Sequence, residues 1–153
     1  MEFEIEFKSA YDERDIVYHA VEQEFDMNSS IYTDFTLMVG CGYLGIDVSL
    51  LSSEIVGISG FCPQKLWISS SLYPPNIKEN GVVKIQSNDE LCSGTGISLF
   101  DDAQIYYDNK NKYCYIDGHT KLVPKHNIRL GKNAIISLCG KIITGIWIRI
   151  ITD

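Results

Sequence analysis

The chain has 153 residues, of which 45% are hydrophobic and 22% are charged, and its formal net charge is −7. This length suits a single domain spanning residues 1–153, and aromatic and β-branched residues along the whole chain exclude a disordered protein. Residues 1–54 contain 12 acidic and 2 basic residues, a balance of 2 − 12 = −10, against +3 for the remainder. Such a charge repels nucleic acid and anionic lipid membranes and attracts a basic partner.

The five cysteines form no C-x-x-C pair and lie more than 20 residues apart, at Cys41, Cys62, Cys92, Cys114 and Cys139. An odd number with this spacing predicts reduced, mostly buried thiols and argues against a disulfide framework or a zinc site. The first residues, MEFEIEFKSA, lack the apolar core of a signal peptide. These features predict a cytoplasmic protein that binds no metal.

Residues 2–8 alternate between apolar and acidic side chains, which predicts a half-buried strand. Residues 12–25 (DERDIVYHAVEQEF) place Val17, Val21 and Phe25 four positions apart, with acids crowded at the start. Acids are favourable in the first turn of a helix, so we expect a helix here. The segment DIVYHAV is also compatible with a strand.

Strand-like runs dominate the rest of the chain. Aromatic-rich runs flank the polar cluster DNKN (108–111), which predicts a β-hairpin over residues 104–116. Residues 133–151 are apolar enough to suggest a membrane helix, but Lys141, Arg149 and a turn signal at 139–141 favour two buried strands. We predict a mainly β protein, α+β at most, built as an antiparallel β-sandwich or a strongly curved sheet with one N-terminal helix.

The stretch VGCGYLG (39–45) matches the G-x-G-x-x-G pattern of dinucleotide-binding loops. Such a loop needs a following helix for the phosphates and an acid after the next strand for the ribose. Here the segment for the helix is barely two turns long, and the next acid after Glu54 is Glu79. We therefore predict that Gly40 and Gly42 lie at a turn or bulge, that Gly45 allows close packing, and that no cofactor is bound.

No other motif indicates catalysis. His119 and His126 lie seven residues apart, which matches no standard metal spacing. The adjacent carboxylates at 101–102 would point to opposite faces of a strand, so they do not form a two-carboxylate site. The protein is therefore not expected to be an enzyme.

Three stretches resemble bacterial immunity proteins encoded beside polymorphic or contact-dependent growth inhibition toxins: GISGFCPQKLW with the downstream LYPP, IYYDNKNKYCYIDG, and IRLGKNAIISLCGKIITGIWI. The resemblance covers about residues 55–150 and contains no catalytic motif. It implies a compact, cytoplasmic, non-catalytic protein that binds and neutralises a cognate toxin, and many such toxins are basic nucleases. It assigns no functional residue, because the folds of these families differ from one another.

The charge of residues 1–54 supplies the candidate partner-binding residues, which are Asp12, Glu13, Asp15, Glu22, Glu24 and Asp26. An acidic face would steer a basic toxin toward the protein and mask its substrate-binding groove. In the alternative interpretation, these acids only coat the solvent side of a helix. Two other functions stay open: a small nucleotide-binding enzyme built on Gly40–Gly45, and a β-rich ligand-binding or structural module, for example for carbohydrate, that uses exposed Tyr73 and Tyr107.

Overall fold

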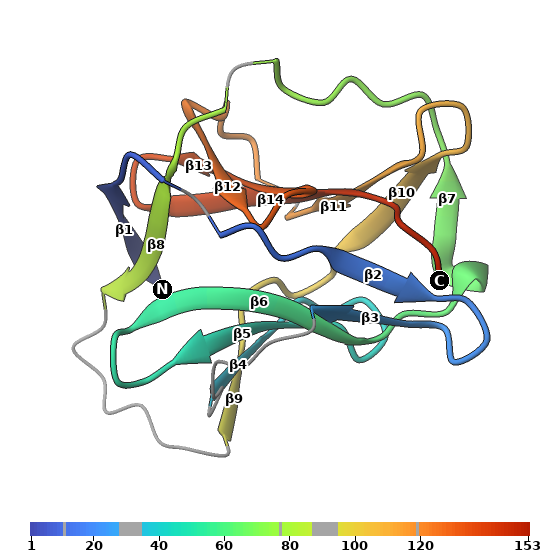
Figure 1. Ribbon diagram of the computed structural model, residues 1–153, viewed down its shortest axis with the longest axis horizontal. Coiled ribbons are helices and arrows are strands. Elements are labelled where there is room, and N and C mark those ends of the chain that lie inside the picture. Colours follow the sequence, from blue (N-terminus) through green and yellow to red (C-terminus); the bar gives the residue numbers. More distant parts are fainter. Residues whose placement is uncertain (11, 28–34, 77, 87–94, 119) are drawn as a thin grey trace.

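Two β-sheets face each other in the computed structural model, which describes residues 1–10, 12–27, 35–76, 78–86, 95–118 and 120–153 (Figure 1). The eight-stranded sheet contains β1 (Glu2–Phe7), β2 (Ile16–His19), β3 (Glu24–Met27), β4 (Phe35–Met38), β5 (Gly45–Ser49), β6 (Glu54–Phe61), β8 (Gly81–Gln86) and β9 (Thr95–Ser98). The six-stranded sheet contains β7 (Trp67–Ser69), β10 (Gln104–Asp108), β11 (Tyr113–Asp117), β12 (His126–Leu130), β13 (Ala134–Cys139) and β14 (Ile142–Arg149).

Strand β6 is the branch point of the eight-stranded sheet. The main path runs β1-β8-β6-β5-β4-β9, with β2 and β3 attached to β6 as a side branch. Glu54 at the start of β6 pairs with Lys84 of β8, whereas Phe61 at its end pairs with Glu24 of β3. β5 pairs with one edge of β6. The strand pairs β1–β8 and β2–β3 therefore both attach to the other edge of β6, from which they diverge.

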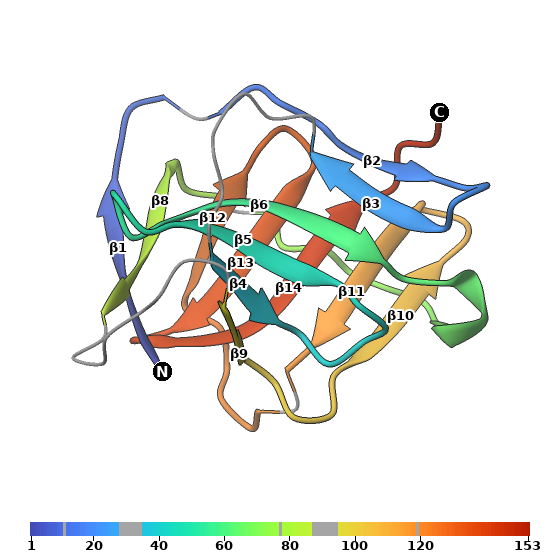
Figure 2. The ribbon, with the colours of Figure 1, turned by 90° about the horizontal axis from the view of Figure 1, so that it is seen from below.

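The second sheet has the order β12-β13-β14-β11-β10-β7, and its pairs are antiparallel except that of β7 with β10. Figure 2 shows β5 and β6 crossing over β14 and β11 of this sheet. Backbone hydrogen bonds join the two sheets at both margins. Arg129 donates to the Glu79 carbonyl (3.0 Å) at one margin, and Tyr18 donates to the Ile151 carbonyl (2.8 Å) at the other.

The core lies between the sheets and is built by alternation along the strands. In β2 and β3 the inward positions Ile16, Tyr18, Phe25 and Met27 are all at most 4% exposed. They belong to one cluster of buried residues that takes side chains from both sheets. Burying a side chain of this size contributes about 1.5–3 kcal/mol, so the facing sheets stabilise each other. The mainly β class is thus confirmed.

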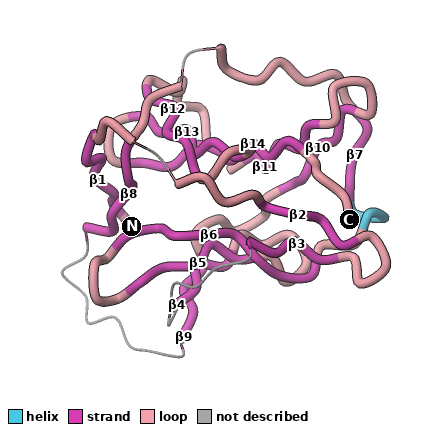
Figure 3. The backbone as a smooth tube through the Cα atoms, viewed as in Figure 1, coloured by secondary structure: helices cyan, strands magenta, loops and turns pink. Residues whose placement is uncertain are grey.

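The helix expected over residues 12–25 is wrong, because these residues contain β2 and β3 instead. Within the described ranges, the only helical element is the short 3-10 turn η1 (Gln64–Leu66), drawn in cyan in Figure 3. The four-residue spacing of Val17, Val21 and Phe25 was misleading, since Val21 is 91% exposed in the turn between the strands. Every second side chain of β2 and β3 is buried. This burial in the core between the sheets outweighs the local preference for a helix.

Two other local predictions are confirmed. Residues 104–116 form the hairpin of β10 and β11, and the apolar stretch 133–151 forms β13 and β14 with a turn at Gly140. No helix in the described part of the chain is long and apolar enough to cross a membrane.

Candidate functional site

Three of the candidate acids lie on the hairpin formed by β2 and β3. These strands pair antiparallel, and Phe25 and Met27 of β3 are buried. Glu24 and Asp26 alternate with them, so their side chains point to the outer surface of the sheet. Glu22 lies in the exposed turn that joins the strands. The hairpin therefore presents three carboxylates on one side of the molecule.

A histidine and the last residue of the chain extend this carboxylate cluster. His19 Nδ1 lies 2.7 Å from Asp153 Oδ2, and His19 Nε2 lies 3.7 Å from Asp26 Oδ2. The hydrogen bond with Asp153 raises the pKa of His19 despite the opposing effect of burial, and the charges of Asp26 and Glu22 raise it further. The contact of His19 with Asp153 thus holds Asp153 against the hairpin.

Strand β5 adds a further acid. Asp47 lies opposite Gly57 of β6, and the Ser59 hydroxyl donates a 2.8 Å hydrogen bond to Asp47 Oδ2. Burial raises the pKa of Asp47; the Ser59 hydrogen bond opposes this, and the charge of Asp26 adds to it. The carboxylates of β3 and β5 therefore influence each other across β6. We call the following residues the acidic face: Glu22, Glu24, Asp26, Asp47 and Asp153.

Two exposed aromatic residues border the acidic face. Phe61 is paired with Glu24 across the β3–β6 contact and is 41% exposed. Tyr43 is 74% exposed, and its ring centroid lies 6.4 Å from that of Phe61. The Tyr43 backbone N–H also donates to the Phe61 carbonyl at 2.8 Å. We call Tyr43 and Phe61 the aromatic pair; apolar rings beside a charged rim have the composition of a protein interface.

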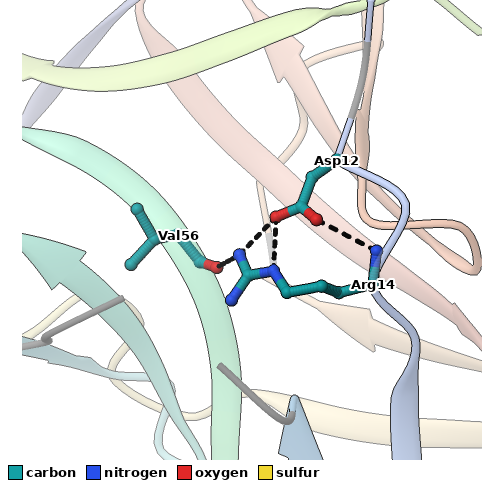
Figure 4. Close-up of polar contacts among 3 residues, drawn as sticks. All are labelled: Asp12, Arg14 and Val56. Carbon is teal, nitrogen blue, oxygen red and sulfur yellow. Dashed lines mark hydrogen bonds and ion pairs between the residues drawn. The ribbon is translucent and has the colours of Figure 1, made fainter. Parts of the chain in front are cut away.

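Of the other three candidate acids, Asp12 is linked through Arg14 to Val56, near the start of β6 (Figure 4). Arg14 Nη2 donates to the Val56 carbonyl (2.8 Å), and Arg14 Nε donates to Asp12 Oδ2 (2.7 Å). Burial raises the pKa of Asp12, but the Arg14 hydrogen bonds outweigh it and the pKa is lowered. Asp12 is therefore neutralised internally, while Glu13 is exposed and Asp15 is half-buried.

Residues 39–44 of the glycine-rich stretch connect β4 and β5, and Gly45 begins β5. Gly40 and Gly42 have φ values of 75° and 59°, in the left-handed region that favours glycine. Gly45 lies against the Thr36 side chain, which leaves no room for a Cβ. Residues 45–49 form β5 in place of the helix that a dinucleotide site requires. The turn interpretation is confirmed, and the close neighbour of Gly45 is a threonine.

An uncharged cavity of about 410 Å³ lies between residues 70–76 and the β10–β11 hairpin. It is lined by Leu72, Tyr73, Pro74, Asn76, Asn111 and Tyr113. The buried Asp108 carboxylate holds its walls together, because it accepts hydrogen bonds from the backbone N–H groups of Leu72 (2.9 Å) and Asn111 (3.1 Å). These two hydrogen bonds lower the pKa of Asp108.

The two tyrosines that were expected to be exposed, Tyr73 and Tyr107, differ in their exposure to solvent. Tyr73 is 84% exposed at the cavity. Tyr107 is half-buried, and its ring centroid lies 5.1 Å from that of Trp67, so the expectation was wrong for Tyr107. The reason is that Trp67 of β7 lies beside β10 in the sheet and covers the Tyr107 ring.

Metal ligands do not gather in the described residues, where no group of three or more His, Cys, Asp or Glu side chains could hold an ion. His126 Nδ1 lies 2.8 Å from Glu79 Oε1, which is a pairwise contact. His119 and Cys92 lie outside the described residues, so what was expected of them stays a prediction.

Comparison with known proteins adds no family. No protein-family model matches the chain, and no curated protein matches it. The functional argument therefore rests on the geometry of the chain's own residues.

Sequence reasoning missed Asp47, Asp153 and the aromatic pair. A local signal existed for Phe61, because alternation in EIVGISGF places it on the same side as Ser59. No local signal existed for Asp153, whose contact with His19 joins residues 134 positions apart. Strand pairing, which the sequence does not display, brings these residues together.

Proposed function

We propose that this protein is a non-catalytic binding protein of the immunity type, which captures a basic toxin domain on the acidic face and neutralises it. One observation carries the proposal: carboxylates from β3 and β5 flank β6 on the same outer surface as the exposed ring of Phe61. The resemblance of residues 55–150 to immunity proteins points to the same class.

The two parts of this surface have different physical roles. Clustered carboxylates raise the rate of encounter with a basic protein, and salt weakens this effect. Large aromatic rings at the centre of an interface slow dissociation where they act as hot spots, which cost about 2 kcal/mol or more when truncated. Covering the basic substrate groove of a nuclease with this surface would exclude its nucleic acid.

The test is binding to toxin domains encoded beside this gene, measured at low and high ionic strength. In the double variant Glu24→Lys/Asp26→Lys, we expect association at low salt to slow by about tenfold or more. The difference from wild type should shrink as salt rises, because screening acts on the steering term. If no neighbouring toxin is bound or neutralised, the proposal is refuted.

The matched control is Glu2→Lys/Glu4→Lys, which makes the same change in net charge on β1. Figures 1 and 2 show β1 at the left of the molecule and β3 toward its right. We expect the control to slow association much less than the β3 variant. Equal slowing by both would mean that net charge, and not the acidic face, controls the encounter.

A second function, carbohydrate binding, is favoured by the uncharged cavity beside Tyr73. Two tyrosines and two asparagines line it, which combines ring faces for the C–H groups of a sugar with amides for its hydroxyls. A glycan array would test this function, with Tyr73→Ala as the binding variant. The control is Tyr106→Ala, since Tyr106 lies outside the cavity lining. Binding to no glycan would remove this second function.

A further inference from the structure

Two buried thiols, close in sequence to Tyr43 and Phe61, face each other. Cys41 Sγ lies 3.8 Å from Cys62 Sγ, in hydrogen-bond contact. Cys41 is 5% exposed and Cys62 is fully buried. A disulfide requires a sulfur–sulfur distance of about 2.05 Å, so these two sulfurs, already in contact, would have to move closer by about 1.8 Å to bond.

The backbone holds the two cysteines in this relation from both sides. Cys41 lies in the turn between the positive-φ residues Gly40 and Gly42, which are exposed. A Cβ on Gly42 would lie 2.7 Å from the Phe61 carbonyl oxygen, so only glycine lets the turn approach β6 this closely. The glycines of the VGCGYLG stretch thereby place the Cys41 thiol against Cys62.

We propose that Cys41 and Cys62 are an oxidation site at which a peroxide forms a reversible disulfide. The Cys41 thiolate attacks one oxygen of hydrogen peroxide, the O–O bond breaks, and Cys41 becomes a sulfenic acid, while the other oxygen leaves as hydroxide and takes up a proton to form water. The Cys62 sulfur then attacks the Cys41 sulfur, an S–S bond forms, and the second water leaves with the Cys62 proton. Overall, two thiols lose two electrons and two protons, and hydrogen peroxide becomes two waters.

The order of these steps follows from the access to each sulfur. Cys41 lies in the exposed turn and is 5% exposed, whereas Cys62 is fully buried, so peroxide reaches Cys41 first. The contact with Cys62 also lowers the pKa of Cys41. Cys41 is therefore the attacking thiolate and Cys62 the resolving thiol. A dithiol reductant reverses the reaction by thiol–disulfide exchange.

The disulfide would fix the surface proposed to bind the toxin, a consequence that rests on the proposed function. Phe61 directly precedes Cys62, and Tyr43 lies two residues after Cys41. The Cys62 N–H also donates to the Gln23 carbonyl, in the turn between β2 and β3 (2.8 Å). A covalent bond between residues 41 and 62 therefore ties the aromatic pair to that turn. We expect slower dissociation of the toxin from the oxidised protein.

Thiol counting on the folded full-length chain tests the proposal without any partner. The protein is treated with hydrogen peroxide, denatured, alkylated and weighed. The reduced chain has five alkylatable cysteines, and the oxidised chain should have 5 − 2 = 3, restored to five by dithiothreitol. Trypsin leaves both cysteines in one peptide, residues 15–65, so a second cut after Glu54 is needed to show the link.

Variants assign the bond. Cys41→Ser should keep all four remaining thiols after peroxide. Cys62→Ser should form no disulfide but should carry Cys41 as a sulfenic acid, one oxygen atom heavier. Cys114→Ser should still lose two thiols. Retention of five thiols in the wild-type chain, or a cross-link that involves Cys114, would overturn the proposal. If the disulfide forms but toxin dissociation is unchanged, the coupling to the acidic face fails and the oxidation site stands.

Discussion

Asn133 is the side chain that joins the acidic hairpin to the second sheet, and its removal gives the sharpest test of the fold. It is 5% exposed in the turn between β12 and β13. Its Oδ1 accepts from the Ile16 N–H (2.8 Å), and its Nδ2 donates to the carbonyls of Ile16 (2.7 Å) and Arg149 (2.8 Å). The side-chain amide of Asn133 therefore hydrogen-bonds the backbone N–H and C=O of Ile16 in β2, as a neighbouring strand would.

Asn133→Ala leaves both backbone groups of Ile16 buried without these partners. Each such group costs about 1–3 kcal/mol, and the Arg149 carbonyl, which is less buried, costs less. We expect the free energy of unfolding to fall by about 4 kcal/mol, which for a chain of this size lowers the melting temperature by about 12 °C. Urea and thermal denaturation measure this loss, and hydrogen exchange should show β2 losing protection first.

Two further variants separate hydrogen bonding from shape. Asn133→Asp keeps the shape but replaces the donor with an oxygen that faces two carbonyls, so it should destabilise at least as much as alanine. Asn127→Ala, which removes an asparagine that accepts a single side-chain hydrogen bond from Ser137, should cost under about 1 kcal/mol. A loss below about 1 kcal/mol for Asn133→Ala, or a stable Asn133→Asp protein, would refute this reasoning.

Three other predictions concern the acidic face and the cavity. NMR titration should place the pKa of His19 above its usual 6.5, and Asp153→Asn should lower it. Since the folded pKa is raised, the stability contributed by protonation of His19 is complete below pH 6.5 and is lost as pH rises through the folded pKa. Phe61→Ala should speed toxin dissociation at least tenfold with little change in association, and an unchanged rate would exclude the aromatic pair. Because the folded pKa of Asp108 is lowered, its contribution to folding stability should be present above its ordinary pKa of 3.8 and lost as pH falls through the folded pKa. Urea unfolding at acidic pH should show this loss of stability in the wild type and not in Asp108→Ala.

The stretches whose fold could be predicted are those in which local pattern and final environment agree. Residues 104–116 carry a turn cluster between two aromatic runs, and they form a hairpin of neighbouring strands. The prediction for residues 12–25 is wrong because their four-residue apolar spacing favours a helix while their β-branched and aromatic residues favour strands. Which of the two forms depends on distant residues that pack against them, such as Trp67. Its ring centroid lies 4.8 Å from that of Tyr18.

The sequence by itself determined the mainly β class, the acidic balance of residues 1–54 and the turn at the glycine-rich stretch. It did so because alternation, net charge and glycine act locally or by composition. Only the tertiary structure decided that Asp12 is neutralised by Arg14, that Asp47 joins Asp26 beside Phe61, and that two cysteines 21 positions apart meet. These relations arise from strand order and register, which are set by the packing of the whole core.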